Sequence, residues 1–129
     1  MTISVPSRKF EGIRVFIVED EALVAMNLEM MLEDLGCEVV GPAMRYDTAE
    51  EMVSNGVHAD IAILDVNLGG REVFPLAARL AKDGIPLIFS TGYGAAVLPE
   101  QWQRRPLLQK PYTVGDVASR LSLALSIEG

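Results

Sequence analysis

Acidic residues follow two short apolar segments of the sequence, and a threonine and a lysine follow two others. Glu19 and Asp20 come after IRVFIV, Asp65 follows IAIL, Thr91 follows IPLIFS, and Lys110 follows PLLQ. If these segments are parallel strands, their carboxyl ends meet at one edge of a sheet, which is where open sheets of this kind bind ligands. The five side chains are therefore expected to lie in one pocket.

Several carboxylates in one pocket raise one another's pKa unless a cation lies among them. A divalent metal that prefers oxygen ligands, above all Mg²⁺, resolves this conflict. A carboxylate nucleophile, a metal ion, a lysine and a hydroxyl are the groups that phosphoryl transfer uses, and an aspartate can carry the phosphoryl group covalently. The sequence predicts such a site, with Asp65 as the nucleophile.

Each of these residues also has an ordinary structural explanation when it is taken alone. Glu19, Asp20 and Glu21 suit the start of a helix, where acids complement the helix dipole. Thr91 suits a turn, and Lys110 suits a solvated position. Their common place at the ends of successive apolar segments favours the functional interpretation.

Five apolar segments alternate with segments of helical length. The apolar segments do not alternate polar with apolar residues, which is typical of strands that are covered on both faces. They span residues 13–18, 38–41, 61–64, 85–89 and 106–108, and helices are predicted over 21–36, 47–56, 71–84 and 113–126. This alternation predicts right-handed β-α-β units and a parallel sheet.

The predicted helices carry boundary signals of their own. Asp47 with Glu50, and Thr113 with Asp116, form capping-box patterns at the starts of the second and fourth helices. Pro75 lies near the start of the third helix and would bend that helix if it came later. The first helix has one apolar stripe, formed by Val24, Leu28, Met31 and Leu35, and it is expected to end at Gly36.

The chain of 129 residues is expected to form one domain over residues 12–129, after a short polar lead-in over residues 1–11. Half of the residues are hydrophobic, and the net charge of −7 argues against binding to nucleic acid or to an anionic membrane. The first residues contain no apolar stretch typical of a signal peptide or a membrane anchor. The single cysteine, Cys37, is expected to pack as a small apolar residue, and a reducing, cytoplasmic location follows.

Four short motifs resemble one known family. They are VED (18–20), LDVNLGG (64–70), FSTGYG (89–94) and KPY (110–112), and they make essentially the whole chain similar to the receiver domain of bacterial two-component response regulators. The resemblance implies an α/β, flavodoxin-like fold with a doubly wound sheet of five parallel strands in the order 2-1-3-4-5. It also implies a signalling protein rather than an enzyme, with self-catalysed phosphotransfer and autodephosphorylation.

The resemblance assigns a role to each motif residue. Asp65 would accept the phosphoryl group from a sensor histidine kinase. Asp20 would bind Mg²⁺ directly and Glu19 directly or through a water, while Asp65 and the backbone carbonyl of Asn67 complete the metal ligands from the protein. The phosphoryl oxygens would be held by Thr91 and Lys110, and the bond before Pro111 is a candidate cis peptide.

The sequence departs from the common family pattern in two places. Leu107 stands where receivers usually carry an aromatic switch residue, and the loop after Asp65 is NLGG rather than a loop with a Met/Pro pair. With PLIFSTGYG, these features resemble the subgroup called "FAT GUY" receivers, many of them single-domain proteins associated with stress-response signalling. We therefore hypothesise that Tyr93 takes over a signalling duty that Leu107 cannot perform.

Signalling by this domain requires a surface for a downstream protein or a phosphorelay partner. The candidates for this surface are Tyr93, Val97, Leu98, Trp102, Arg104, Arg105 and Tyr112. Trp102 is either an interface anchor with a basic rim, or it packs on the helix between the fourth and fifth strands while the two arginines are solvated. His58 is expected on the surface, and the protein is expected to be a monomer or a weak homodimer.

Other functions fit the sequence less well. A small phosphatase or phosphotransferase acting on metabolites would also use Asp65 as nucleophile, but enzymes of the haloacid-dehalogenase type place an acid/base aspartate two residues later, where this chain has Asn67. A receiver-like scaffold without phosphorylation is disfavoured because the expected polar groups are present. A nucleotide-binding fold is disfavoured because EDEA, rather than a glycine-rich loop, follows the first strand.

Overall fold

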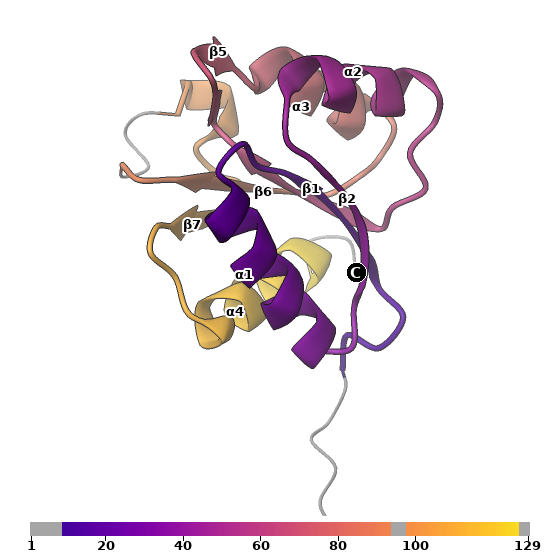
Figure 1. Cartoon of the computed structure of the whole chain (residues 1–129), viewed down its shortest axis with the longest axis vertical. Coiled ribbons are helices and arrows are strands. Elements are labelled where there is room, and N and C mark those ends of the chain that lie inside the picture. The colour runs from indigo at the N-terminus through magenta and orange to yellow at the C-terminus, as the bar shows by residue number, and fades with distance from the viewer. Residues whose placement is uncertain (1–8, 94–97, 127–129) are drawn as a thin grey trace, which may run out of the picture.

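Five parallel strands form the main sheet, in the order β2-β1-β3-β6-β7 (Figure 1). The computed structural model describes residues 9–93 and 98–126. The strands are β1 (Arg14–Val18), β2 (Glu38–Ala43), β3 (Ile61–Asp65), β6 (Leu87–Thr91) and β7 (Leu107–Gln109). In chain order this is the arrangement 2-1-3-4-5, so the predicted flavodoxin-like, doubly wound fold is confirmed.

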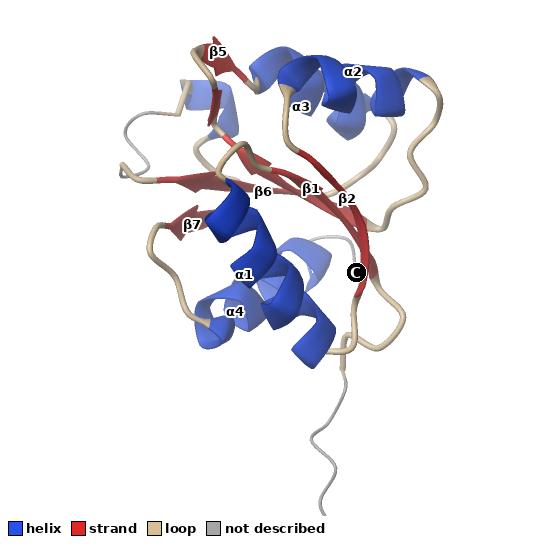
Figure 2. Cartoon of the chain, in the orientation of Figure 1, coloured by secondary structure: helices blue, strands red, loops and turns tan. Residues whose placement is uncertain are grey.

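Helices cover both faces of the sheet (Figure 2). Helices α1 (Ala22–Asp34) and α4 (Val114–Ser126) lie on one face, and α2 (Tyr46–Ser54) and α3 (Phe74–Lys82) lie on the other. Along β1, Val15 and Ile17 pack toward the first pair, and Phe16 and Val18 toward the second. This double burial explains why the strands read as unbroken apolar runs. No helix in the described ranges is long and apolar enough to cross a bilayer.

Helix α1 differs from its prediction in the phase of its buried face. Ala25, Leu28 and Leu32 are its buried residues, whereas the predicted stripe included Val24 and Met31, which are only half-buried. The small side chain of Ala25 is buried in place of the larger Val24. The predicted end of the helix is confirmed, because Gly36 adopts φ 91°, a left-handed conformation that glycine accepts without strain.

The third helix begins later than the predicted boundary at residue 71. Arg71–Glu72 form a short strand, β5, which pairs antiparallel with β4 (Asn67–Leu68). Helix α3 therefore starts at Phe74, and Pro75 lies in its first turn, where a proline needs no hydrogen-bond donor. The bend that a later proline would cause is thus avoided.

One of the two predicted capping boxes is present. The backbone N–H of Thr113 donates to Asp116 Oδ2 (2.9 Å), and the N–H of Asp116 donates to Thr113 Oγ1 (3.1 Å). The prediction of a capping box at Asp47 is wrong, because α2 begins at Tyr46 and its N-cap residue is Arg45. Arg45 makes no side-chain capping hydrogen bond. Asp47 instead forms an ion pair with Arg71 on β5.

The connection between β6 and β7 contains a short 3-10 helix, η2 (Glu100–Trp102), within its described residues. Trp102 is 6% exposed and packs edge-on against Phe89, with ring centroids 5.6 Å apart. The prediction that Trp102 and Leu98 belong to an exposed partner surface is therefore wrong, because both are buried. Trp102 packs inside the fold, against Phe89 of β6. Val97 lies outside the described residues.

Two further residues are buried on the α1/α4 side of the sheet. Cys37 is 6% exposed, and burial raises the pKa of its thiol to about 11, with a smaller contribution from Glu11. Phe10, which lies within the predicted polar lead-in, is 5% exposed and packs into the same core cluster. The folded core therefore includes at least one residue of that segment.

Candidate functional site

Four carboxylates meet at the carboxyl ends of β1 and β3. Glu19, Asp20 and Glu21 follow β1, Asp65 ends β3, and each contributes one oxygen to a group whose members all lie within 4.8 Å of one another. Parallel pairing between β1 and β3 sets this position, because Val18 is opposite Leu64 in the register. Glu19 and Asp65 are buried, at 2% and 6% exposure.

Lys110 brings a positive charge to these carboxylates from the residue after β7. Its Nζ lies 3.0 Å from Glu19 Oε1, 3.2 Å from Glu21 Oε1 and 3.3 Å from Asp65 Oδ2. The backbone N–H of Lys110 donates to the carbonyl of Thr91, which ties the end of β7 to the end of β6. The Lys110–Pro111 peptide bond is cis.

The electrostatics of the cluster are unbalanced, with one amine facing several acids. Burial and, after it, the charge of Glu19 raise the pKa of Asp65 to about 7, against the opposing effect of Lys110. Burial alone would lower the pKa of Lys110, but the hydrogen bond to Glu19 and the charges of Asp65 and Glu19 outweigh it, and the pKa of Lys110 is raised. The cluster therefore favours additional positive charge.

The donor set fits a hard divalent cation. Carboxylate oxygens are ligands that Mg²⁺ prefers, and Glu19, Asp20, Glu21 and Asp65 each bring one oxygen to the cluster. Glu19 is already engaged, because Oε1 lies next to Lys110 and Oε2 accepts the backbone N–H of Glu21 (3.0 Å). Glu19 is thus better placed as an outer partner of a metal than as its main ligand.

Thr91 ends β6 at the rim of the same pocket. Its side chain is buried, at 4% exposure, and its hydroxyl accepts a hydrogen bond from the backbone N–H of Tyr93 (3.1 Å). The side chain of Tyr93 is 73% exposed, so this residue offers its ring to solvent or to a partner. Leu107 is half-buried against the α2/α3 side of the core.

Tyr112 was predicted to lie on the exposed partner surface, but the structure places it partly inside the fold. It is half-buried and packs against the core cluster under α1 and α4. Its hydroxyl is buried, and among the residues that the structure describes it has no hydrogen-bond partner. Burial raises the pKa of Tyr112 to about 12, with Glu19 adding to the shift. Its ring also lines a surface pocket with Val24 and Met31 of α1.

The hairpin formed by β4 and β5 is a part of the site that the sequence interpretation missed. It follows Asp65 directly, and Gly69 and Gly70 form its turn with φ 59° and 94°. The backbone N–H of Gly69 donates to Asp20 Oδ2 (3.0 Å), which connects the hairpin to the acidic cluster. A Gly-Gly pair between short segments is a known hairpin signal, but two-residue strands are too short to show a periodic pattern.

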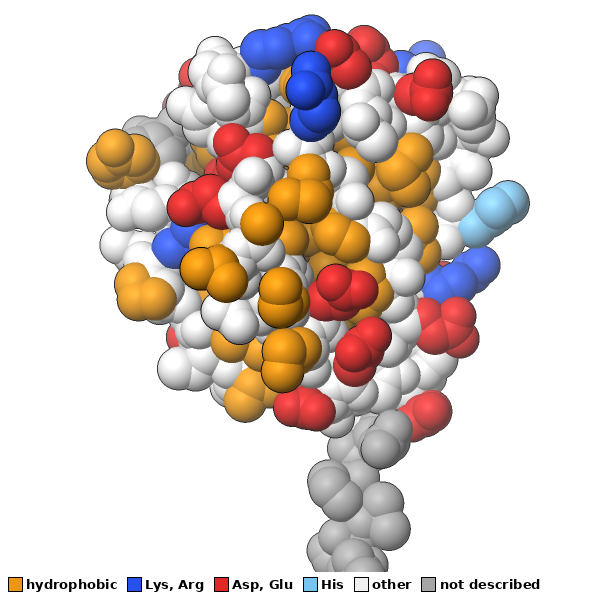
Figure 3. All heavy atoms as spheres, in the orientation of Figure 1, with side chains coloured by type: hydrophobic (Ala, Val, Ile, Leu, Met, Phe, Trp, Pro, Cys, Tyr) orange, Lys and Arg blue, Asp and Glu red, His pale blue; other side chains and the backbone are white. Residues whose placement is uncertain are grey.

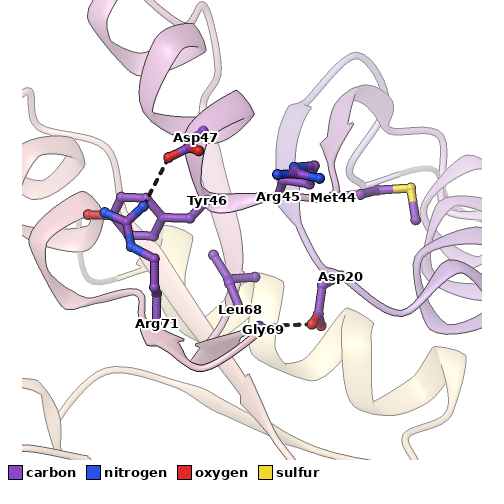
Figure 4. Close-up of a pocket in the computed structure, with 8 residues that line it drawn as sticks. All are labelled: Asp20, Met44, Arg45, Tyr46, Asp47, Leu68, Gly69 and Arg71. Carbon is purple, nitrogen blue, oxygen red and sulfur yellow. Dashed lines mark hydrogen bonds and ion pairs between the residues drawn. The ribbon is translucent and has the colours of Figure 1, made fainter.

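Two cavities adjoin the acidic cluster. One, of about 640 Å³, contains Asp65, Thr91 and Lys110 together with Tyr93 and Glu72. The second, of about 330 Å³, lies between the β2–α2 loop and the hairpin, where the Arg71 guanidinium stacks 3.6 Å above the ring of Tyr46 (Figure 4). Asp20 and Gly69 line both cavities, so the hairpin forms a wall between them.

Comparison with known proteins agrees with this geometry. A family model described as the response regulator receiver domain matches residues 15–120. The transcriptional regulatory protein PdtaR of Mycobacterium tuberculosis is 33% identical, over 88% of this chain and 57% of that protein. The phyllosphere-induced regulator PhyR of Methylorubrum extorquens is 31% identical, over 86% of this chain and 43% of that protein. The chain thus spans about half the length of these curated relatives.

Solved structures give the same result with higher identity. The solution structure of SdrG from Sphingomonas melonis Fr1 is 42% identical, covers 88% of this chain and 97% of that chain, and has a TM-score of 0.79. A second solution structure shows SdrG in its BeF3-activated conformation. Its sequence is 43% identical to this chain, the match covers 87% of this chain and 94% of that chain, and the TM-score is 0.74. The fold, the acidic cluster at its strand ends and the family match over residues 15–120 lead to one conclusion. The chain belongs to the response regulator receiver domain family.

Proposed function

We propose that Asp65 accepts a phosphoryl group from the phosphohistidine of a sensor kinase in a Mg²⁺-dependent reaction. One observation carries this proposal: Asp65, a buried carboxylate, has Lys110 Nζ 3.3 Å from Oδ2 and shares a cavity with Thr91 and Asp20. These are the groups that phosphoryl transfer to a carboxylate needs. The BeF3-activated conformation of a relative, SdrG, supports an analogous state here.

In the proposed reaction an Asp65 carboxylate oxygen attacks phosphorus, and the bond between phosphorus and the histidine nitrogen breaks. The histidine leaves with the electron pair of that bond, so no other reactant is required. Bound Mg²⁺ would neutralise phosphoryl charge, held by Asp20, Asp65 and the carbonyl of Asn67. Lys110 exchanges part of its contact with Glu19 for a phosphoryl oxygen, and the Thr91 hydroxyl donates to another.

The phosphatase alternative is less well supported. The residue two positions after the nucleophile, Asn67, has an amide side chain whose oxygen accepts the backbone N–H of Gly70 (2.8 Å). An amide does not exchange protons as a general acid or base at neutral pH, and here it serves the hairpin turn instead. The site therefore favours stoichiometric phosphorylation over turnover of metabolites.

We further propose that phosphorylation is read by a partner protein at the exposed surface beside the site. Tyr93 is 73% exposed, although it is only two residues from Thr91. Apolar side chains also gather on the outer face of α1, where Leu23, Met26 and Met30 are 72%, 52% and 58% exposed (Figure 3). The similarity to SdrG and PhyR supports a place in stress-response phosphorelay signalling, as the FAT GUY-like motif suggests.

Phosphorylation with acetyl phosphate and Mg²⁺ tests the proposal directly. We expect an intact-mass increase of one phosphoryl group in the wild type, sensitive to hydroxylamine as an acyl phosphate is. The Asp65→Asn variant should show no such adduct, and chelation of Mg²⁺ should abolish it in the wild type. Equal labelling of the wild type and Asp65→Asn would disprove the role of Asp65.

Partner readout at Tyr93 requires a separate test. Tyr93→Ala keeps the backbone N–H that binds Thr91, so labelling of Asp65 should be unchanged. Kinases and target proteins of the host that bind the phosphorylated wild type should bind this variant more weakly. Unchanged phosphorylation together with unchanged partner binding would show that Tyr93 has no signalling duty.

A further inference from the structure

The hairpin after Asp65 returns a carboxylate to the phosphoacceptor cavity. In its antiparallel register Glu72 is opposite Asn67, and Arg71 is opposite Leu68. Glu72 therefore lines the same cavity as Asp65, Thr91 and Lys110, although it lies seven positions further along the chain than Asp65. Pairing across the hairpin, rather than proximity in the sequence, brings this residue to the site.

The hairpin is anchored at both ends and at its turn. The N–H of Val73 donates to the carbonyl of Val66 (2.9 Å), and Val73 is fully buried. Leu68 is 4% exposed, and at the turn the N–H of Gly69 binds Asp20. These contacts fix the backbone on both sides of Glu72.

Arg71, the residue before Glu72, lies on the opposite side of the hairpin from the phosphoacceptor cavity. Its guanidinium stacks on the ring of Tyr46 and lies 2.9 Å from Asp47 Oδ1, on the far wall of the hairpin (Figure 4). Because successive side chains of a strand point to opposite sides, Arg71 facing Tyr46 leaves Glu72 facing the phosphoacceptor cavity.

Among the described residues, the carboxylate of Glu72 is not engaged by any other side chain or backbone group. It is exposed, and within residues 9–93 and 98–126 it forms no hydrogen bond or ion pair, in contrast to Glu19 and Glu21, which both contact Lys110. Asp65 lies at the buried floor of the cavity, and Glu72 lies at its exposed rim. A phosphoryl group on Asp65 would thus face solvent on the side where Glu72 stands.

We propose that Glu72 orients the water that hydrolyses the aspartyl phosphate, and so sets the lifetime of the signal. This inference rests on the proposed function, because it requires phosphorylated Asp65. In-line attack needs the water oxygen on the side of phosphorus opposite the Asp65 oxygen, which is the rim side of the cavity. The Glu72 carboxylate accepts a hydrogen bond from that water and directs its lone pair toward phosphorus.

The reaction is balanced without a further reactant. The water oxygen forms a bond to phosphorus, the bond from phosphorus to the Asp65 oxygen breaks, and Asp65 leaves as a carboxylate with the electron pair. Both water protons stay with the product, so the aspartyl phosphate dianion and water give the carboxylate and dihydrogen phosphate. Glu72 takes part through orientation and is unchanged at the end.

A purely electrostatic role for Glu72 makes a different prediction. A carboxylate at the rim of an acidic cavity would also repel an anionic phosphodonor. In that case, removing its charge would speed the labelling of Asp65 and would leave the lifetime of the aspartyl phosphate unchanged. The rates of labelling and of loss therefore distinguish the two roles.

The experiment compares the wild type with Glu72→Gln, Glu72→Ala and Glu50→Gln. Glu50 is exposed on α2, outside the cavity, so Glu50→Gln matches the change in charge. Each protein is labelled with acetyl phosphate and Mg²⁺ and desalted, and the phosphorylated fraction is followed by phosphate-affinity electrophoresis. We expect a roughly tenfold longer half-life for both Glu72 variants, the scale of one lost hydrogen bond to a charged group, and the wild-type half-life for Glu50→Gln.

Two outcomes would overturn the inference. A half-life for Glu72→Gln and Glu72→Ala equal to that of the wild type would do so, whether or not labelling became faster. Equal lengthening in Glu50→Gln would do so as well, because the effect would then be one of net charge. If Asp65 in the wild type formed no aspartyl phosphate at all, the proposed function would fail first.

As a control, the labelled proteins are denatured in urea. The aspartyl phosphate should then hydrolyse at the same rate in the wild type and in all variants, because the folded cavity is absent.

Discussion

The hydroxyl of Thr91 accepts a hydrogen bond from the backbone N–H of Tyr93, two residues later, at 3.1 Å. The bond occupies an acceptor position of the hydroxyl and leaves its own proton free to donate. Thr91 is 4% exposed and lies beside Asp65 and Lys110, so a phosphoryl oxygen in the cavity is the acceptor that suits it. The contact connects the phosphoryl site to a residue whose side chain is 73% exposed.

Removal of the Thr91 hydroxyl should weaken binding of a phosphoryl group while leaving the fold intact. We expect Thr91→Ala to bind beryllofluoride, a mimic of the phosphoryl group, roughly tenfold more weakly, the loss of one hydrogen bond to a charged acceptor. Thr91→Ser keeps the hydroxyl and should bind within about threefold of the wild type. Titration followed by NMR measures both affinities. Equal affinities of Thr91→Ala and the wild type would contradict this role.

Lys110 should contribute to stability as well as to chemistry. Replacing it with glutamine leaves Glu19, at 2% exposure, and Asp65 without the cation that lies within 3.3 Å of each. Breaking a buried ion pair in this way should lower the free energy of unfolding by about 3 kcal/mol in the absence of metal. Urea denaturation in EDTA measures this change.

Lys82→Gln serves as the control, because Lys82 is exposed in the last turn of α3 and should contribute less than about 1 kcal/mol. An effect of Lys110→Gln no larger than that of Lys82→Gln would show that Lys110 is not needed to balance the acidic cluster.

Fold and site were predictable from the sequence to different extents. The unbroken apolar runs indicated strands that are buried on both faces, and the polar residue after each run indicated the edge where the site lies. Thr113 and Asp116 were predicted correctly because a capping box is a local pattern, complete within four residues.

Features set by long-range packing were not predictable in this way. Asp47 fits a capping pattern, but its partner is Arg71, which only the hairpin brings within reach. Trp102 lies in a polar, basic segment, yet its ring packs on Phe89 of β6. In both cases the decisive contact joins residues far apart in the sequence.

Trp102 should therefore behave as a core residue. Trp102→Ala removes a ring that packs edge-on against Phe89, and it should lower the free energy of unfolding by about 3–4 kcal/mol through the cavity left behind. Trp102→Phe keeps an aromatic ring and should cost less than about half of that amount. Chemical denaturation measures both. If Trp102→Ala were about as stable as the wild type, the conclusion that Trp102 is a core residue would be contradicted.

Neutralising the phosphoacceptor should stabilise the metal-free protein at alkaline pH. Burial and the charge of Glu19 raise the pKa of Asp65 to about 7 in the folded state, from 3.8 as its ordinary value. Between these pH values the folded state binds more protons than the unfolded state, so the free energy of unfolding falls as pH rises toward 7. In Asp65→Asn this contribution is absent.

We therefore expect the free energy of unfolding of Asp65→Asn at pH 8 in EDTA to exceed that of the wild type by at least ~1 kcal/mol. When the pH is lowered to 5, this free energy should rise much less in Asp65→Asn than in the wild type. Mg²⁺ should stabilise the wild type at pH 8 far more than Asp65→Asn, because binding to the folded state alone adds to its stability. Urea denaturation of both proteins at both pH values, with EDTA or with Mg²⁺, measures these three comparisons. Glu50→Gln controls for net charge and should follow the wild type. A metal-free Asp65→Asn less stable than the wild type at pH 8 would show that Lys110 already balances the cluster and that its need for a metal is small.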